Sequence, residues 1–209
     1  MPAKRRIETI QYLTSEEMKA LLAAIRREIR AKSNSPRADT RRNVYRDHAV
    51  FTLAYRYGLR AEEVGRLRMA DYDASARKLF VTRVKSGVSR HYPLYDDELT
   101  VLRAHLRRCD DDSPEAPLFP SNRGTGIDRK MLHVLMRRYG GMAGIPVAKQ
   151  HFHSLRHTCA VHLLDMGQQL VFVQDWLGHT HIENTRVYAK ISDKNFAERA
   201  RTASSGFQT

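Results

Sequence analysis

The chain has 209 residues, a length that suits one large domain with a real hydrophobic core. Its 36 Lys and Arg outnumber its 23 Asp and Glu, and the resulting net charge of +13 makes nucleic acid the first partner to consider. No apolar run approaches the roughly 20 residues that span a bilayer, so we expect a soluble protein. Cys109 and Cys159 fit neither a disulfide framework nor a four-thiolate zinc site, which favours the reducing cytoplasm.

Amphipathic helices are predicted for the first part of the chain. Residues 14–17, Thr-Ser-Glu-Glu, match a capping box, and the apolar residues that follow at helical spacing predict a helix to about Ala31. A polar stretch that contains Pro36 then indicates a loop. A second helix is expected to end at Gly58, and a short third helix is expected to begin near Ala61.

A small β-hairpin is predicted within this helical chain. Residues 77–94 are rich in β-branched and aromatic side chains, and Lys85-Ser86-Gly87 in their middle favours a turn. The pattern therefore predicts a mainly α, α+β fold with one small antiparallel hairpin or sheet near 77–94. Further helices are expected at 96–108, 128–139, 154–166, 170–177 and 185–191.

Several ionisable residues lie at the start of one predicted helix, in the run HFHSLRH. Helical spacing places His153, Arg156 and His157 on one face. An exposed basic face is the ordinary interpretation of this pattern. A zinc site built from His153, His157, Cys159 or His162 is an alternative. Zinc is disfavoured because Cys159 falls on a different face from His153, and because no second ligand pair occurs at finger-like spacing.

Two further features follow toward the end of the chain. Leu177-Gly178-His179 closes one predicted helix, and Tyr188 lies nine residues after His179. Taken alone, Gly178 is a helix stop, His179 is a surface residue and Tyr188 is a half-buried aromatic. Their order and their combination with the earlier motifs give them a functional meaning.

The combination resembles the tyrosine recombinase family, whose members include phage integrases and bacterial dimer-resolution recombinases. Five motifs occur in the family's order between about Leu13 and Ser192: the segment GLRAEEV, the lysine of the hairpin, the HxxR pattern, the LGH segment and the late tyrosine. The resemblance implies six catalytic residues and two supporting ones. They are Arg60, Lys85, His153, Arg156, His179 and the nucleophile Tyr188, supported by Glu63 and His157.

These residue types suit the transfer of a DNA strand. Arg60 and Arg156 present planar guanidinium groups that neutralise a phosphate as charge builds in the transition state. Tyr188 offers the nucleophilic hydroxyl, and His153 is our candidate for accepting its proton. The resemblance implies that Lys85 protonates the departing 5′ oxygen. It also implies a 3′-phosphotyrosyl intermediate and no requirement for a metal or another cofactor.

The resemblance also implies partners and a division of the chain. We expect double-stranded DNA, a homo-oligomer with four protomers on two duplexes, and accessory DNA-bending proteins. The predicted parts are a basic N-terminal arm at 1–12, a catalytic domain at 13–192, and a tail at 193–209 that docks on a neighbouring protomer. Typical members carry a separate N-terminal DNA-clamping domain. The chain is therefore either a catalytic fragment or a short form resembling the fimbrial phase-switch invertases. The basic start after Met1 favours the short form.

The predicted function is site-specific DNA recombination, for integration, excision or inversion. Two other functions remain as alternatives. One is a DNA-binding regulator with the same fold and no reaction, which is disfavoured because every required chemical group is present. The other is a relaxing topoisomerase of the type IB kind, which relaxation of a supercoiled plasmid without a specific site distinguishes.

Overall fold

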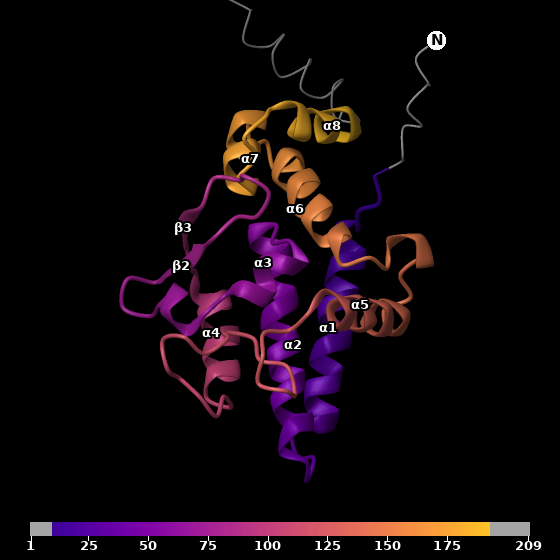
Figure 1. Ribbon diagram of the computed structural model, residues 1–209. Helices are drawn as coiled ribbons and strands as arrows, with labels where there is room; N and C mark the ends of the chain where they lie inside the picture. Colours follow the sequence, from indigo (N-terminus) through magenta and orange to yellow (C-terminus); the bar gives the residue numbers. More distant parts are fainter. Residues whose placement is uncertain (1–9, 193–209) are drawn as a thin grey trace, which may run out of the picture.

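The computed structural model describes the backbone of residues 10–192 and the side chains of residues 10–189. Most of the arm predicted at 1–12 and the whole tail predicted at 193–209 lie outside the described residues. Within the described part, no helix is long and apolar enough to cross a membrane. The elements in chain order (Figure 1) are α1 (Ser15–Lys32), α2 (Ala38–Tyr57), α3 (Ala61–Arg66), η1 (Met69–Asp71), β1 (Tyr72–Asp73), β2 (Lys78–Val81), β3 (Arg90–Pro93), α4 (Asp96–Leu106), α5 (Arg129–Met142), η2 (Val147–Lys149), α6 (His153–Asp165), α7 (Leu170–Leu177) and α8 (Glu183–Ser192).

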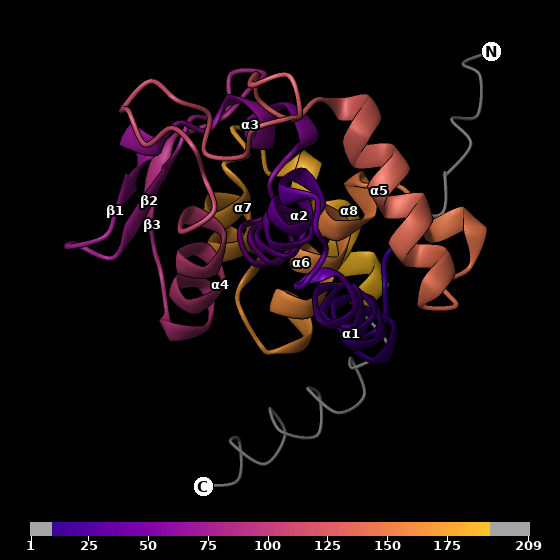
Figure 2. The ribbon, with the colours of Figure 1, turned by 90° about the horizontal axis from the view of Figure 1, so that it is seen from below.

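This mainly helical fold with one small sheet confirms the predicted fold class, and α2 lies at its centre. Figure 2 shows α2 between α4 and the sheet on one side and α1 and α5 on the other. Phe51 of α2 is fully buried and packs edge-to-face against Tyr139 and Phe152, with ring centroids 5.6 and 5.7 Å away. Each such pair adds about 0.5–1.5 kcal/mol beyond the area that it buries. Helix α2 therefore holds α5 and the start of α6 in one core.

Helix α1 begins where the sequence predicts. The Thr14 hydroxyl accepts a hydrogen bond from Glu17 N at 3.2 Å, and Glu17 Oε2 accepts one from Thr14 N at 2.8 Å. This capping box satisfies two N–H groups that a helix start otherwise leaves without partners. The apolar face of α1, with Leu21 and Ile25 fully buried, packs on α2.

Gly58 ends α2 and turns the chain into α3. Its φ of 58° and ψ of 40° lie in the left-handed region, which glycine adopts without steric penalty. A Cβ atom at this position would lie 2.4 Å from Leu177 Cδ2, so the buried Leu177 side chain of α7 would have to shift to admit it. This turn makes Arg60 the N-cap residue of α3 and gives it a defined place.

The predicted hairpin is present and gains a third strand. Strands β2 and β3 pair antiparallel, with Leu79 opposite Tyr92. The added strand, β1, has only two residues, which is too short for a sequence pattern to reveal. Residues 82–89 connect β2 to β3, a longer connection than the predicted turn, and within it Lys85 and Ser86 have φ angles of 57° and 58°. Because non-glycine residues seldom adopt this conformation, contacts with the rest of the molecule must hold the loop.

Candidate active site

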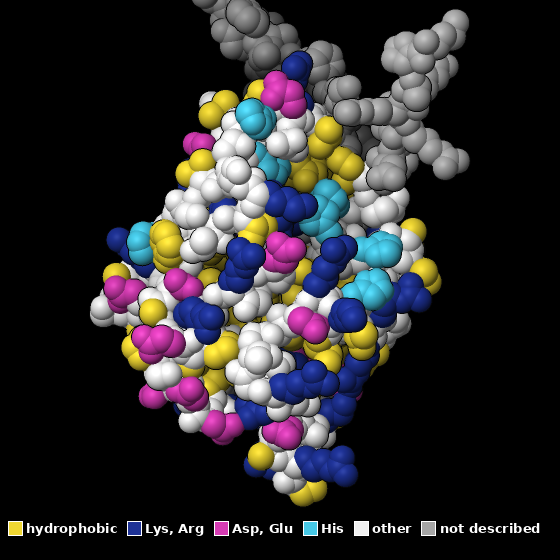
Figure 3. Space-filling view, in the orientation of Figure 1, with side chains coloured by type: hydrophobic (Ala, Val, Ile, Leu, Met, Phe, Trp, Pro, Cys, Tyr) yellow, Lys and Arg dark blue, Asp and Glu magenta, His cyan; other side chains and the backbone are white. Residues whose placement is uncertain are grey.

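Four segments meet on one face of the molecule: the turn before α3, the loop between β2 and β3, the start of α6, and the segment from α7 into α8. A cleft of about 370 Å³ lies on this face, and Arg60, Lys85 and His153 are among the residues that line it. Figure 3 shows Lys, Arg and His side chains gathered there. The cleft therefore brings together three of the six side chains for which the resemblance implies catalysis.

Arg60 is held in place by Glu63. Arg60 Nη1 donates to Glu63 Oε1 at 2.8 Å, while Glu63 Oε2 accepts a hydrogen bond from Arg60 N at 2.9 Å. Glu63 is almost wholly buried. Burial alone would raise its pKa, but Arg83 and the two contacts with Arg60 outweigh burial and hold the pKa below its usual value. Glu63 is therefore a charged anchor for Arg60, which fits the supporting role that the resemblance implies.

Arg156 is also buried and is fixed by two backbone carbonyl groups. Its Nη1 donates to Gly58 O at 2.5 Å, and its Nη2 donates to Leu177 O at 2.9 Å. Burial lowers its pKa to about 10, with a further contribution from the nearby positive charge of Arg60. The guanidinium therefore stays charged at neutral pH, and the ends of α2 and α7 hold it.

The Tyr188 hydroxyl lies 2.8 Å from Nδ1 of His157. Tyr188 is buried, and burial raises the pKa of its phenol to about 12. The charges of Arg156 and Arg60 act in the opposite direction, which shows that both arginines lie within electrostatic reach of the hydroxyl. The sequence favours His153 as the acceptor of the phenolic proton, whereas in the structure His157 is the imidazole that contacts the hydroxyl.

Two histidines on the first turns of α6 lie together beside the arginines. The rings of His153 and His157 meet edge to face, with centroids 4.4 Å apart. Desolvation lowers the pKa of each to about 4, and the positive charge of Arg156 contributes to both shifts. Both imidazoles are therefore neutral at pH 7 in the DNA-free protein, the form that can accept a proton from a phenol.

His179 follows the glycine that ends α7 and bonds to α8. Its Nδ1 lies 2.8 Å from the hydroxyl of Thr185, which is fully buried and sits one turn before Tyr188. Burial lowers the pKa of His179 to about 3, and the positive charges of Arg156 and Arg60 contribute to the same shift. His179 therefore shares the electrostatic environment of the two arginines, and Thr185 orients its ring.

Two further residues of the site, Arg83 and Thr185, are not predicted by the sequence motifs. Arg83 has no exposed side-chain surface, and its guanidinium forms an ion pair with Glu63 at 2.8 Å. The only sequence signal for Arg83 was a charged residue next to the predicted strand, and the signal for Thr185 was a polar residue three positions before Tyr188. Neither signal is specific, because the partners that define each residue come from distant parts of the chain.

The structure lends no support to the zinc alternative. Among the residues that it describes, no group of three or more His, Cys, Asp or Glu side chains could hold a metal ion. Cys159 is buried and lies 3.5 Å from the carbonyl oxygen of Arg56. Burial raises the pKa of its thiol to about 12, so Cys159 is protonated at neutral pH in the metal-free protein.

The low pKa values of these histidines predict that acid destabilises the protein. The ordinary histidine pKa is 6.5, whereas His157 titrates near 4 in the folded protein. Between these values the unfolded state binds more protons, so the free energy of unfolding should fall as the pH is lowered from about 6.5 toward 4. Urea unfolding at several pH values measures this slope. His157→Gln should make it shallower, whereas the exposed control His91→Gln should not; equal slopes in all three proteins would contradict the assignment.

Comparisons with known proteins show what this chain is similar to. The model of the phage integrase family matches residues 11–195. The Type 1 fimbriae regulatory protein FimB of Escherichia coli K12 is 31% identical over 179 residues, which cover 85% of this chain and 82% of that protein. The expected resemblance to the fimbrial proteins is therefore confirmed.

Two solved structures that share this fold come from longer chains. The crystal structure of XerA recombinase superposes with a TM-score of 0.73 at 27% identity, covering 97% of this chain and 66% of that one. The XerH site-specific recombinase, solved as a post-cleavage complex with its palindromic difH substrate, gives a TM-score of 0.73 at 21% identity. That match covers 91% of this chain and 52% of XerH, and it shows a shared fold.

Proposed function

Since the chain belongs to the phage integrase family and is a tyrosine-type site-specific recombinase, we propose that Tyr188 is the nucleophile with which it cleaves and rejoins double-stranded DNA. One observation carries this assignment. The Tyr188 hydroxyl lies 2.8 Å from a neutral imidazole, within electrostatic reach of Arg60 and Arg156. A phenol beside a proton acceptor and two cations is suited to attack a phosphodiester.

In the first step, the Tyr188 oxygen forms a bond to phosphorus while the bond from phosphorus to the 5′ oxygen breaks. His157 takes the phenolic proton, because it is the imidazole that contacts the hydroxyl, and His153 stacks edge to face behind it. Arg60 and Arg156 neutralise the charge that builds on the phosphate. The assignment of the proton to His157 replaces our expectation of His153.

The departing 5′ oxygen needs a proton, because an alkoxide is a poor leaving group. Lys85 lines the cleft beside Arg60 and His153, and it supplies that proton. His179 donates a supporting hydrogen bond to the phosphate. The 3′-phosphotyrosyl bond conserves the energy of the broken diester, so a 5′ hydroxyl from another duplex reverses the attack and joins the strands in a new arrangement.

Capture of the covalent product tests this function directly. The protein is incubated in EDTA with a library of random-sequence duplexes, and DNA that stays attached after denaturation is sequenced. A recombinase yields an enriched sequence attached through tyrosine. DNA bound without attachment would favour the silent regulator, and attachment without sequence preference, with relaxation of supercoiled plasmid, would favour the topoisomerase.

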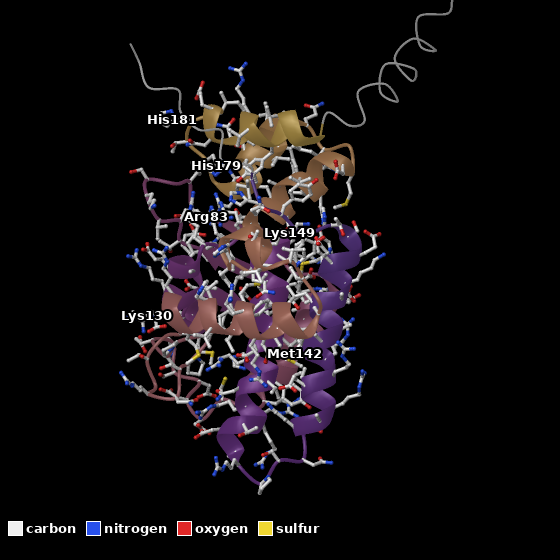
Figure 4. The ribbon with its side chains drawn as sticks, turned by 90° about the vertical axis from the view of Figure 1, so that its right-hand side faces the viewer. Arg83, Lys130, Met142, Lys149, His179 and His181 are labelled. Carbon is white, nitrogen blue, oxygen red and sulfur yellow. The ribbon has the colours of Figure 1, made fainter. Side chains whose placement is uncertain are left out.

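The cleft continues beyond the reacting groups and indicates the path of the DNA. Arg129 and His133 of α5 and His151 line its other end. Figure 4 shows Lys130 of α5 and His179 along the same side of the molecule. We infer that a duplex follows this side, with its backbone against α5.

A single substitution on α5 tests this path. Arg129→Ala should weaken DNA binding at low salt and reduce the slope of log affinity against log salt by about 0.9, the effect of one lost phosphate contact. Binding is measured by fluorescence anisotropy between 50 and 300 mM KCl. Arg103→Ala on α4, exposed on the opposite side of α2, is the control and should leave the slope unchanged. An unchanged slope in Arg129→Ala would remove α5 from the DNA path.

We also propose the finer parts of the assembly. The chain comprises a basic N-terminal arm at 1–12, a catalytic domain at 13–192 and a tail at 193–209 that docks on a neighbouring protomer. It acts in the cytoplasm as a tetramer on two duplexes, with accessory DNA-bending proteins. Paired half-sites should bind more tightly than one half-site through protomer contacts; equal affinities would contradict the assembly.

A further inference from the structure

We propose that Arg83 is a positioning residue for strand cleavage, which rests on the proposed function. It joins the loop that carries Lys85 to the segments that carry Arg60, Arg156 and His179. Its side chain has no exposed surface, so it meets no substrate and acts only through the groups that it holds. Figure 4 shows Arg83 close to His179 on the side of the molecule assigned to DNA.

Acceptors from four different segments surround the Arg83 guanidinium. Its Nη1 pairs with Glu63 Oε2 at 2.8 Å, and its Nη2 donates to Tyr57 O at 2.8 Å. The same Nη2 donates to Tyr92 Oη at 2.5 Å and to Trp176 O at 2.9 Å. A planar fork of N–H donors suits this divergent set, whereas a lysine ammonium is a compact point charge. One side chain therefore ties the hairpin to α3 and to the ends of α2 and α7.

The groups that bind Arg83 also hold the two predicted catalytic arginines. Glu63 pairs with Arg60 through its other oxygen at 2.8 Å. At the end of α2, Tyr57 O accepts from Arg83, and the next carbonyl, Gly58 O, accepts from Arg156 at 2.5 Å. At the end of α7, Trp176 O accepts from Arg83, and the next carbonyl, Leu177 O, accepts from Arg156 at 2.9 Å. A displacement of Arg83 would therefore reach both arginines.

The hairpin loop is anchored on both sides of Lys85. Before it, Val84 N donates to Glu63 Oε1 at 3.3 Å. After it, Val88 N donates to Gly178 O at 3.1 Å. A Cβ atom at Gly178 would come within 2.8 Å of Val88 O, so the loop and the end of α7 touch closely. These contacts hold Lys85 in its left-handed conformation, beside the segment that leads to His179.

A buried arginine can also be purely structural, and Arg46 provides the matched case. Arg46 is buried, pairs with Asp47 at 2.8 Å and donates to Pro120 O at 2.8 Å, but its partners carry none of the predicted catalytic groups. Removing either arginine takes one ion-pair partner from a buried carboxylate, which destabilises the fold, although Glu63 keeps Arg60 and Asp47 keeps the hydroxyl of Tyr139. If the Arg83 variant cleaves DNA more slowly than Arg46→Met does, the additional loss of rate is therefore due to the position of the catalytic groups and not to a loss of stability.

The test uses the full chain, DNA of the captured sequence, and the same DNA with sulfur at the 5′ bridging position. Thermal unfolding, DNA affinity and single-turnover cleavage are measured for Arg83→Met, Arg83→Lys, Tyr92→Phe and Arg46→Met. Arg83→Met and Arg83→Lys should bind DNA within a few-fold of wild type but cleave it about 10²-fold more slowly, because a small misplacement of reacting groups has effects of this size. Tyr92→Phe removes one hydroxyl from the network, so it should fold stably and cleave roughly 10-fold more slowly.

Arg83 acts on cleavage through Lys85 and through Arg60 and Arg156, and the sulfur substrate separates these two effects. A thiolate leaves without a proton, so this substrate should remove only the part of the defect that arises through Lys85. Partial rescue of the Arg83 variants is therefore expected. The proposal would be overturned if the Arg83 variants cleaved DNA as fast as Arg46→Met does. It would also be overturned if sulfur rescued them completely, because Arg60 and Arg156 would then be undisturbed. Absence of an adduct with wild-type protein would instead overturn the function itself.

Discussion

Tyr188→Phe is expected to abolish covalent attachment to DNA while DNA affinity stays within a few-fold of wild type. The substitution removes only the hydroxyl that lies 2.8 Å from His157 Nδ1, and the ring still fills its buried site. Without the oxygen, no bond to phosphorus can form, so the loss should be complete to the detection limit. Denaturing gels with labelled DNA of the captured sequence measure the adduct, and anisotropy measures the binding.

Tyr55→Phe is the matched control for this prediction. The Tyr55 hydroxyl also bonds a histidine, lying 2.9 Å from His162 Nδ1, but on another part of the molecule. This variant should form the adduct at the wild-type rate. Adduct formation by Tyr188→Phe would show that a different residue is the nucleophile.

Lys85→Ala is expected to cleave ordinary DNA about 10²-fold to 10⁴-fold more slowly, the usual contribution of a general acid. The same variant should cleave a 5′-bridging phosphorothiolate at nearly the wild-type rate, because a thiol has a much lower pKa than an alcohol and its thiolate leaves unprotonated. Single-turnover rates on both substrates give the answer.

Two variants serve as controls for the Lys85 result. Arg60→Ala should not be rescued by sulfur, because its role is to neutralise the phosphate whatever group leaves. Lys78→Ala, which changes an exposed lysine of β2 in the same sheet, should cleave both substrates normally. If sulfur leaves the Lys85→Ala defect unchanged, Lys85 only contacts DNA, and the acid is another group such as His179.

Local signals predicted much of the fold. The Thr14 capping box and the left-handed end at Gly58 depend on residues within one or two turns, and both are present in the structure. Strand β1 escaped prediction because two residues contain no alternation. The sequence predicts a tight turn at Lys85, whereas the structure has a longer loop, because its conformation depends on contacts with α3 and α7 that no local pattern contains.

The candidate site was predicted as a set of residues and not as a set of contacts. Helical spacing places His153 and His157 on one face, but it cannot say which of them meets α8; the structure gives that place to His157. Arg83 was overlooked for a similar reason. A charge in the core is recognisable only by its partners, and those of Arg83 lie at 57, 63, 92 and 176 in the chain.

The two glycine caps have an electrostatic consequence for Arg156. Gly58 and Gly178 end α2 and α7 in the left-handed conformation, and the last carbonyl groups of both helices point at the Arg156 guanidinium. The negative ends of two helix macrodipoles thus converge on one buried cation. These carbonyl groups offset the cost of burying the charge, so Arg156 stays a cation in the core although no described carboxylate forms an ion pair with it.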